Sequence, residues 1–137
     1  MIVVDTNVLS ELMRPSPSQR VRGWLGEQPA SDLFVTAISI AEILYGIERL
    51  ADGRRKERFA DLARELFTEF EDQVLAFDER AASVYASIVT RREALGAPIN
   101  GFDAQIAAIC ATHNAALATR NTKDFDNLDI PLIDPWK

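Results

Sequence analysis

Short apolar runs alternate along the chain with longer segments in which apolar residues return every three or four positions. The short runs are rich in β-branched residues, which predicts buried strands. They cover residues 2–4, 33–36, 74–77, 116–119 and 131–133. The longer segments predict amphipathic helices, and they cover residues 6–13, 18–27, 39–50, 54–70, 79–95 and 102–113. Because strands alternate with helices, we expect an α/β fold with a mostly parallel sheet of four or five strands.

Turn and capping residues support these boundaries. Pro15 and Pro17 end the first helix, since proline disrupts a helix interior. Asp78 is placed to cap the helix that follows it. The segment 96–98 (Gly-Ala-Pro) ends that helix. No linker, repeat or low-complexity stretch divides residues 1–137, so we expect a single domain.

Composition narrows the classes of function. The chain has 137 residues and a net charge of −6, which argues against a protein that coats nucleic acid by charge alone. It leaves open an enzyme whose acidic site recruits metal ions while local basic patches meet phosphates. Cys110 is the only cysteine and His113 the only histidine, so neither an internal disulfide nor a zinc cluster is expected. No long apolar run or basic leader is present, and we expect a cytoplasmic protein.

Three carboxylates fall at one end of the predicted sheet. Asp5 directly follows the first strand, Glu42 lies one turn into the helix after the second, and Asp103 begins the helix before the fourth. Sites in open parallel sheets form outside the carboxyl ends of the strands. A carboxylate cluster without histidine suits Mg²⁺ or Mn²⁺. Such an ion activates water and stabilises the charge that develops in phosphodiester cleavage.

Each of these acids also has a purely structural interpretation. Asp5 could cap the helix that follows it. Ser39 and Glu42 fit the S-x-x-E capping box. Asp103 could serve a helix start capped by Asn100. The three acids together, at one end of the sheet, are less easily explained as caps.

A polar segment follows the fourth strand. It carries Thr119, Asn121 and Asp124. Such a segment can be a turn that hydrogen-bonds its own backbone. Alternatively, these side chains lie at the strand-end site, where they hold water, a metal ion or a neighbouring carboxylate.

Four blocks of the sequence resemble PIN-domain ribonucleases, and they occur in the order that this family has. Within the family the chain is most similar to the VapC toxins of bacterial type II toxin–antitoxin pairs, including the FitB-like subgroup. The blocks are MIVVDTNVLSEL at 1–12, TAISIAEILYGI at 36–47, FDAQIAA at 102–108 and ATRNTKDF at 118–125.

The resemblance implies one PIN domain over residues 1–137, an α/β/α sandwich, and Mg²⁺- or Mn²⁺-dependent endonucleolytic cleavage of RNA. The three core acids of the family correspond to Asp5, Glu42 and Asp103, and a fourth polar position corresponds to Asn121. Asp124 occupies a position that varies in the family. The resemblance further implies a homodimer and a cognate VapB-type antitoxin whose C-terminal tail covers the site. The lack of a long apolar run, by contrast, is what predicts no membrane partner.

From this resemblance we expect Asp5 and Asp103 to bind the metal directly. Glu42 would bind it through water or orient the attacking water. Thr6 and Asn121 would adjust the surroundings of the metal, with Thr119 and Asp124 in support.

Basic residues are candidates for guiding the RNA. Arg120 and Lys123 flank the expected site. The clusters at 54–58 and at Arg91–Arg92 are either further RNA contacts or ordinary solvated helix faces. The sequence leaves Trp24 and Trp136 open between the core, a dimer interface and an antitoxin contact.

Two other functions remain open. The first is a haloacid-dehalogenase-like phosphatase, a class in which a strand is followed by the motif D-x-D. Here Asp5 is followed by Thr6 and Asn7, so the second aspartate of that motif is missing. A catalytically weak PIN domain would act as an RNA- or protein-binding module, although the presence of Asp5, Glu42 and Asp103 argues against such a loss of activity.

Overall fold

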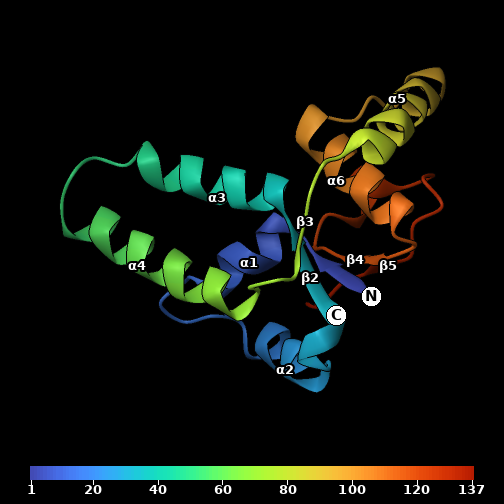
Figure 1. The fold of residues 1–137 in the computed structure, drawn as a ribbon. Helices are drawn as coiled ribbons and strands as arrows, with labels where there is room; N and C mark the ends of the chain where they lie inside the picture. The colour runs from blue at the N-terminus through green and yellow to red at the C-terminus, as the bar shows by residue number, and fades with distance from the viewer.

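The fold is a five-stranded sheet between two layers of helices, in a computed structural model that describes residues 1–137 (Figure 1). The strand order is β3-β2-β1-β4-β5. All four strand pairs are parallel, where the sequence predicted a mostly parallel sheet. The strands are β1 (Ile2–Val4), β2 (Leu33–Thr36), β3 (Val74–Leu75), β4 (Ala116–Ala118) and β5 (Leu132–Ile133).

Six α-helices connect and cover these strands, within a few residues of the predicted boundaries. They are α1 (Thr6–Leu12), α2 (Gln19–Glu27), α3 (Ala37–Glu48), α4 (Arg54–Glu69), α5 (Glu79–Ala94) and α6 (Gly101–Thr112). Two 3₁₀ turns, Ala30–Asp32 and Thr122–Phe125, were not predicted. None of the helices is both long and apolar enough to cross a lipid bilayer.

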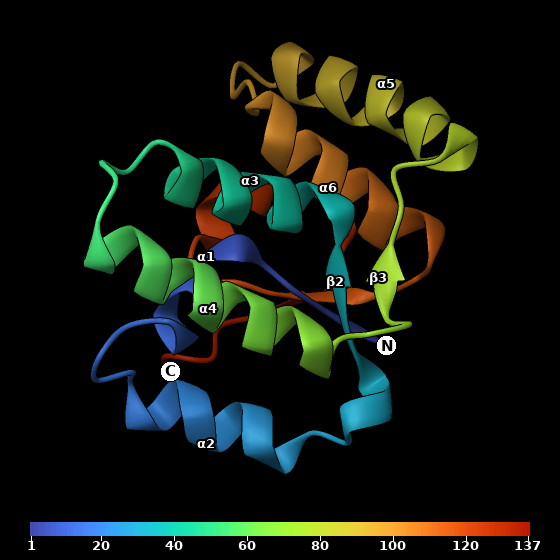
Figure 2. The ribbon, with the colours of Figure 1, turned by 60° about the vertical axis from the view of Figure 1, so that its left-hand side comes forward.

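The two faces of the sheet carry separate apolar cores. Successive side chains of a strand point to opposite faces. Accordingly Val3 of β1 belongs to the core formed with α5 and α6, whereas Val4 belongs to the core formed with α1 to α4. Figure 1 shows α3 and α4 on one side of the strands and α5 and α6 on the other, and Figure 2 shows the same helices after a 60° rotation. The predicted α/β/α sandwich is therefore confirmed.

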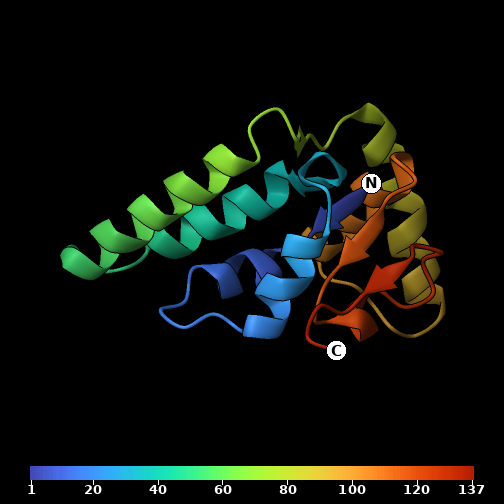
Figure 3. The ribbon, with the colours of Figure 1, turned by 90° about the horizontal axis from the view of Figure 1, so that it is seen from below.

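Helices α3 and α4 pack side by side and extend beyond the edge of the sheet (Figures 1 and 3). Ile43 and Ile47 of α3 and Ala63 and Leu66 of α4 are buried in one core. The amphipathic pattern of 54–70 therefore packs against α3, and its polar side is left exposed.

The order of the strands places a switch point at the centre of the sheet. From β1 the chain builds β2 and β3 on one side, and later adds β4 and β5 on the other. The connections on the two sides of β1 consequently diverge at the carboxyl ends of β1 and β4, where open α/β sheets bind ligands. Asp5 and Thr119 are the residues that directly follow these two strand ends.

Arg92 does not lie on a solvated helix face, as one interpretation of the Arg91–Arg92 pair had it. Its side chain is buried, and its Nε–H donates to the Ala97 carbonyl at 2.7 Å. Its Nη1 donates to the Asp124 carbonyl at 2.8 Å. Arg92 therefore ties the loop before α6 to the 3₁₀ turn after β4. Asp103 lies in the first turn of α6, and Asp124 lies in that 3₁₀ turn.

Replacing Arg92 should destabilise the fold strongly, because two backbone carbonyl groups in different segments would lose the buried charged donor that joins them. For Arg92→Met we expect the free energy of unfolding to fall by about 2 kcal/mol or more. The matched control is Arg91→Met, which removes an exposed ion pair with Asp129 and should cost less than about 1 kcal/mol. Urea denaturation of both variants checks this, and equal losses would contradict the structural role of Arg92.

Candidate active site

Asp5 is the most buried acid of the site, with 4% of its surface exposed. Its Oδ1 accepts the backbone N–H of Thr6 at 2.8 Å, so the predicted capping role is confirmed. Its Oδ2 serves a different purpose, since it accepts the Thr119 hydroxyl at 2.7 Å and the Asn7 amide at 3.2 Å. Burial raises the pKa of Asp5, and the hydrogen bonds from Thr119 and Thr6 offset part of that rise.

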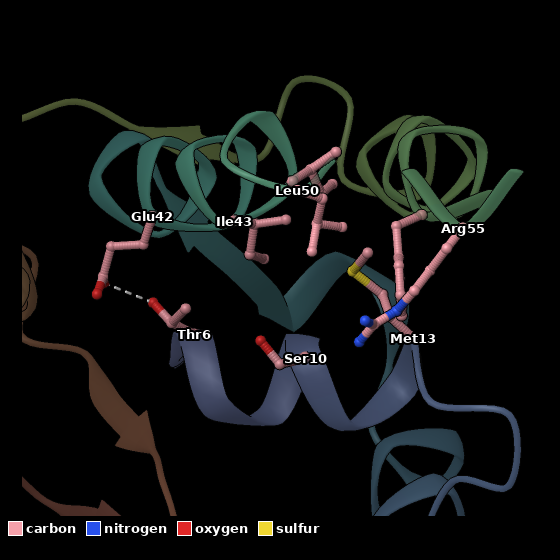
Figure 4. A pocket seen from close by; sticks show the side chains of 10 residues that line it. Thr6, Ser10, Met13, Glu42, Ile43, Leu50 and Arg55 are labelled. Carbon is pink, nitrogen blue, oxygen red and sulfur yellow. Dashed lines mark hydrogen bonds between the residues drawn. The ribbon is translucent and has the colours of Figure 1, made fainter. Parts of the chain in front are cut away.

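Glu42 is not part of a capping box. Helix α3 begins two residues earlier than predicted, and its N-cap is Thr36, whose hydroxyl oxygen accepts the Ser39 N–H at 3.1 Å. The Glu42 side chain instead reaches across to α1, where Oε1 accepts the Thr6 hydroxyl at 2.8 Å (Figure 4). Burial raises the pKa of Glu42, the Thr6 hydrogen bond opposes this rise, and the negative charge of Asp103 adds to it.

Asp103 lies in the first turn of α6. Asn100 is the N-cap, as predicted, since its Oδ1 accepts the Asp103 N–H at 2.8 Å and its amide donates to Asp103 Oδ2 at 2.8 Å. Burial raises the pKa of Asp103 to about 6, and the charge of Asp5 contributes to this rise. Asp103 therefore bonds to the N-cap residue of its helix and is also close enough to Asp5 for the two charges to interact.

The fold brings Asp5, Glu42 and Asp103 into one electrostatic neighbourhood. The charge of Glu42 raises the pKa of Asp5, and the charge of Asp5 raises that of Asp103. No three or more Asp, Glu, His or Cys side chains converge closely enough to form a complete metal-binding group. The donors are nevertheless all oxygens, and Mg²⁺ commonly takes one or two carboxylates and completes its shell with water and substrate phosphates.

The segment after β4 reaches the site mainly through its backbone and through one buried hydroxyl. Thr119 is fully buried and links Asp5 to the Asn121 N–H, which donates to Thr119 Oγ1 at 3.1 Å. The side chain of Asn121 is exposed, so the hydrogen bond of Asn121 to the site comes from its backbone. Asp124 is also exposed, yet its charge raises the pKa of both Asp5 and Asp103.

The predicted RNA contacts Arg120 and Lys123 are both exposed beside this segment. The guanidinium carbon of Arg120 lies 4.9 Å from the centre of the Trp136 ring. In the other basic cluster, Lys56 pairs with Asp52, whereas Arg55 turns toward a hollow that also contains Glu42.

The sequence profile of the PIN domain matches residues 2–131, a range that includes every carboxylate described above. The chain belongs to the PIN domain family. This membership confirms the family that the four sequence blocks predicted.

Proteins of known identity match this PIN domain over nearly its full length. Toxin FitB of Neisseria gonorrhoeae is 36% identical over 137 residues, with 99% of each chain covered. VapC ribonuclease Y4jK of Sinorhizobium fredii is 34% identical over 138 residues, covering 100% of this chain and 99% of the relative. These similarities confirm the predicted VapC and FitB subgroup of toxins.

Solved structures give the same result. The crystal structure of FitAcB from Neisseria gonorrhoeae superposes with a TM-score of 0.92 at 36% identity, covering 99% of both chains. The structure of FitAB bound to the IR36 DNA fragment also gives a TM-score of 0.92, at 35% identity, covering 100% of this chain and 96% of the other.

Asn7 is a site residue of this PIN domain that sequence reasoning missed. Its amide donates to Asp5 Oδ2 and, at 3.1 Å, to Thr119 Oγ1. Its own carbonyl oxygen accepts the Arg120 N–H at 3.2 Å. Asn7 therefore fixes Asp5 relative to the segment after β4. Its position two residues after Asp5 was the available signal.

A hollow of about 280 Å³ opens between α1, α3 and α4 beside the candidate site (Figure 4). Thr6 and Glu42 lie at one end, and Arg55 lies at the other. Between them the wall is largely apolar, formed by Met13, Ile43, Ile47, Leu50 and Phe59. Glu42 is thus accessible from a hollow that suits an apolar side chain of a binding partner.

The raised pKa of Asp103 predicts a pH-dependent stability in the absence of metal. Because the pKa is about 6 in the folded chain and 3.8 in the reference state, ionisation of Asp103 favours the unfolded chain. Below pH ~4 this carboxyl is protonated in both states and has no such effect. The Asp103→Asn variant should therefore become progressively more stable than the wild type between about pH 4 and pH 6.

Urea denaturation in EDTA at several pH values measures this difference. Above pH ~6 the difference between variant and wild type should stay constant. A difference that is independent of pH over the whole range would contradict the electrostatic strain on Asp103.

Proposed function

We propose that this PIN domain is a Mg²⁺- or Mn²⁺-dependent endoribonuclease and the toxin of a VapBC-type toxin–antitoxin pair. The observation that carries the proposal is that Asp5, Glu42 and Asp103 lie near enough to one another for their negative charges to raise each other's pKa values. Such mutual repulsion is relieved by a bound cation. Relatives named VapC ribonuclease and Ribonuclease VapC1 support the reaction class.

In this proposal Asp5 and Asp103 hold the metal directly, and Glu42 binds it through water or orients the attacking water. The bound metal supplies water activation and stabilisation of the charge on the phosphate. Thr119 and Asn7 hold Asp5 Oδ2 in place through their hydrogen bonds. The carboxylate is therefore oriented before any ligand arrives, which lowers the cost of assembling the site.

Glu42 suits a role in moving a proton. The Thr6 hydroxyl donates to Oε1 of Glu42 and orients it. Burial raises the pKa of Glu42 toward neutral pH, and a general base is most effective when its pKa lies near the working pH. Asn121 remains a proposed contributor of a polar group near the metal, and its exposed side chain would have to turn toward the carboxylates.

The proposal predicts that loss of any of the three acids abolishes metal-dependent RNA cleavage. For Asp5→Asn, Asp103→Asn and Glu42→Gln we expect the rate to fall by at least roughly 10²–10³, because metal stabilisation contributes several kcal/mol. A mixed RNA panel incubated in Mg²⁺, Mn²⁺ or EDTA provides the assay, and calorimetric titration with Mn²⁺ measures metal binding separately. Glu48→Gln, an exposed acid on the same helix as Glu42, is the matched control and should cleave as the wild type does.

The outcomes of this assay separate the alternatives. Cleavage that is equal in all variants would come from a contaminating nuclease. RNA binding without cleavage, in protein freed of any antitoxin, would favour the catalytically weak PIN domain that acts as a binding module. Discrete fragments that require metal and vanish in the three variants support the nuclease, and their ends identify the RNA that is cut.

We further propose a cognate VapB-type antitoxin as partner. Solved relatives are described as toxin–antitoxin complexes, among them FitAB and VapBC2 from Rickettsia felis. We place the antitoxin tail in the apolar hollow beside Glu42, because an apolar side chain bound there would obstruct Glu42. A homodimer is also proposed, and the exposed apolar side chains of Leu44, Tyr45 and Phe102 are candidates for its interface.

Leu50→Glu should weaken inhibition by the antitoxin and leave RNA cleavage by the free toxin unchanged. The substitution places a charge in the apolar wall of the hollow, and we expect the antitoxin Kd to rise about tenfold or more, the effect of losing one well-packed apolar contact. Inhibition curves with the antitoxin encoded beside the toxin measure this. Leu95→Glu, at an exposed position after α5, is the matched control, and equal effects of both variants would contradict the proposed position.

A further inference from the structure

A second hollow lies along the segment after β4 and the last turn of the chain. It measures about 470 Å³, and none of its lining residues is apolar. Three cations line it, Arg120, Lys123 and Lys137, together with the acids Asp124 and Asp134. We call it the Arg120 hollow.

The charge of the Arg120 hollow is opposite to that of the chain. Its lining side chains carry three positive and two negative charges, whereas the chain as a whole carries −6. The salt bridges of the structure involve other basic groups, and Arg120, Lys123 and Lys137 are absent from all of them. The charge of Arg120 also helps to lower the pKa of Glu11, but no salt bridge holds any of the three cations, so they can meet an anionic ligand.

The hollow adjoins the carboxylates through the backbone of its own lining residues. The N–H of Arg120 donates to Asn7, and the N–H of Asn121 donates to Thr119. Asn7 and Thr119 are the two side chains that hold Asp5 Oδ2. A ligand in the Arg120 hollow would consequently lie next to the position where the proposed reaction takes place.

Arg120 is supported by an aromatic ring. Its guanidinium lies over Trp136, which is itself half-buried against the core of the α1–α4 layer. The backbone N–H of Trp136 donates to Asp134 Oδ1 at 2.9 Å, and the backbone N–H of Lys137 donates to the Asp134 carbonyl at 3.1 Å. Local hydrogen bonds therefore hold the last turn. A guanidinium held over an aromatic ring offers its second face to a nucleobase and its N–H groups to a phosphate.

We propose that the Arg120 hollow binds the nucleotide next to the scissile phosphate of single-stranded RNA. The base stacks on the Arg120 guanidinium, and Lys123 and Lys137 contact the phosphate. The inference rests on the proposed function, because it takes RNA as the substrate. It assigns a role to Trp136, which supports Arg120 and does not itself contact the base.

The basic cluster on α4 has a weaker claim to this role. Lys56 is paired with Asp52, and the guanidinium groups of Arg55 and Arg58 lie near the Phe59 ring of their own helix. In the structure no hydrogen bond joins Arg54, Arg55 or Arg58 to the residues around Asp5, whereas the Arg120 hollow has two such links.

The test measures RNA binding separately from cleavage. Binding of a fluorescein-labelled mixed-sequence 12-nucleotide RNA is followed by anisotropy in EDTA at several salt concentrations. We expect Arg120→Gln, Lys123→Gln and Lys137→Gln each to weaken binding about five- to tenfold. The slope of log K against log salt should fall by roughly 0.7 for each lost phosphate contact.

Two further variants sharpen the test. Arg120→Lys keeps the charge but removes the planar surface, so it should retain the salt slope and still bind more weakly than the wild type. Arg80→Gln is the matched control, because Arg80 donates to Thr112 at the opposite end of α6 from Asp103. Its RNA affinity should stay within about twofold of the wild type, as expected for a surface cation outside the binding site.

The outcomes distinguish this inference from the proposed function. If the wild type cleaves RNA but the Arg120, Lys123 and Lys137 variants bind and cleave like the wild type, the Arg120 hollow is rejected and the nuclease stands. If the wild type binds RNA through these residues but never cleaves it in Mg²⁺ or Mn²⁺, the nuclease is rejected and the hollow stands. Variants that lose antitoxin affinity and keep RNA affinity would overturn the inference, as would a wild type that does not bind the RNA.

Discussion

The buried carboxylate of Asp5 is the constraint on which the site depends. A charged group removed from water is costly unless hydrogen bonds compensate it. Asp5 obtains this compensation from the start of α1, through the Thr6 N–H and the Asn7 amide, and from the end of β4, through the Thr119 hydroxyl. Satisfying one carboxylate thus joins the neighbouring strands β1 and β4 at their carboxyl ends, where the candidate site lies.

The other two acids, Glu42 and Asp103, carry an electrostatic cost that the fold does not remove. Glu42 and Asp103 are only partly buried, yet both have raised pKa values, because burial and neighbouring negative charges act in the same direction. Thr6 and Asn100 orient these carboxylates without neutralising them. Buried Arg92 is the nearby cation that lowers the pKa of Asp103, and its hydrogen bonds are made to backbone carbonyls instead of to the carboxylates. The charge that would complete the site must therefore come from outside the chain.

The two hollows beside the site differ in chemistry, and this difference suggests a division of roles. The hollow next to Glu42 is largely apolar and is formed by α1, α3 and α4, which suits a protein partner. The Arg120 hollow has no apolar residue in its lining and carries cations that form no salt bridge, which suits an RNA strand. An inhibitor seated in the first hollow would obstruct Glu42, and a substrate seated in the second would lie next to the residues that hold Asp5. The two ligands would then compete for the same site, so inhibition would not require a change in the fold.

Local sequence patterns were sufficient to predict an α/β fold with a mostly parallel sheet and to place Asp5, Glu42 and Asp103 at its strand ends, because helical periodicity, short β-branched runs and strand ends are encoded within a few neighbouring residues. The tertiary structure decided what those residues contact. Thr6 and Glu42 are 36 positions apart, and Asn7 and Thr119 are 112 positions apart, so no local pattern revealed that Glu42 bonds to α1 or that Asn7 holds Asp5. For the same reason the sequence suggested a capping box at Ser39 and left Arg92 on the surface. Hydrogen bonds between distant segments exist only once the sheet has brought their strand ends together.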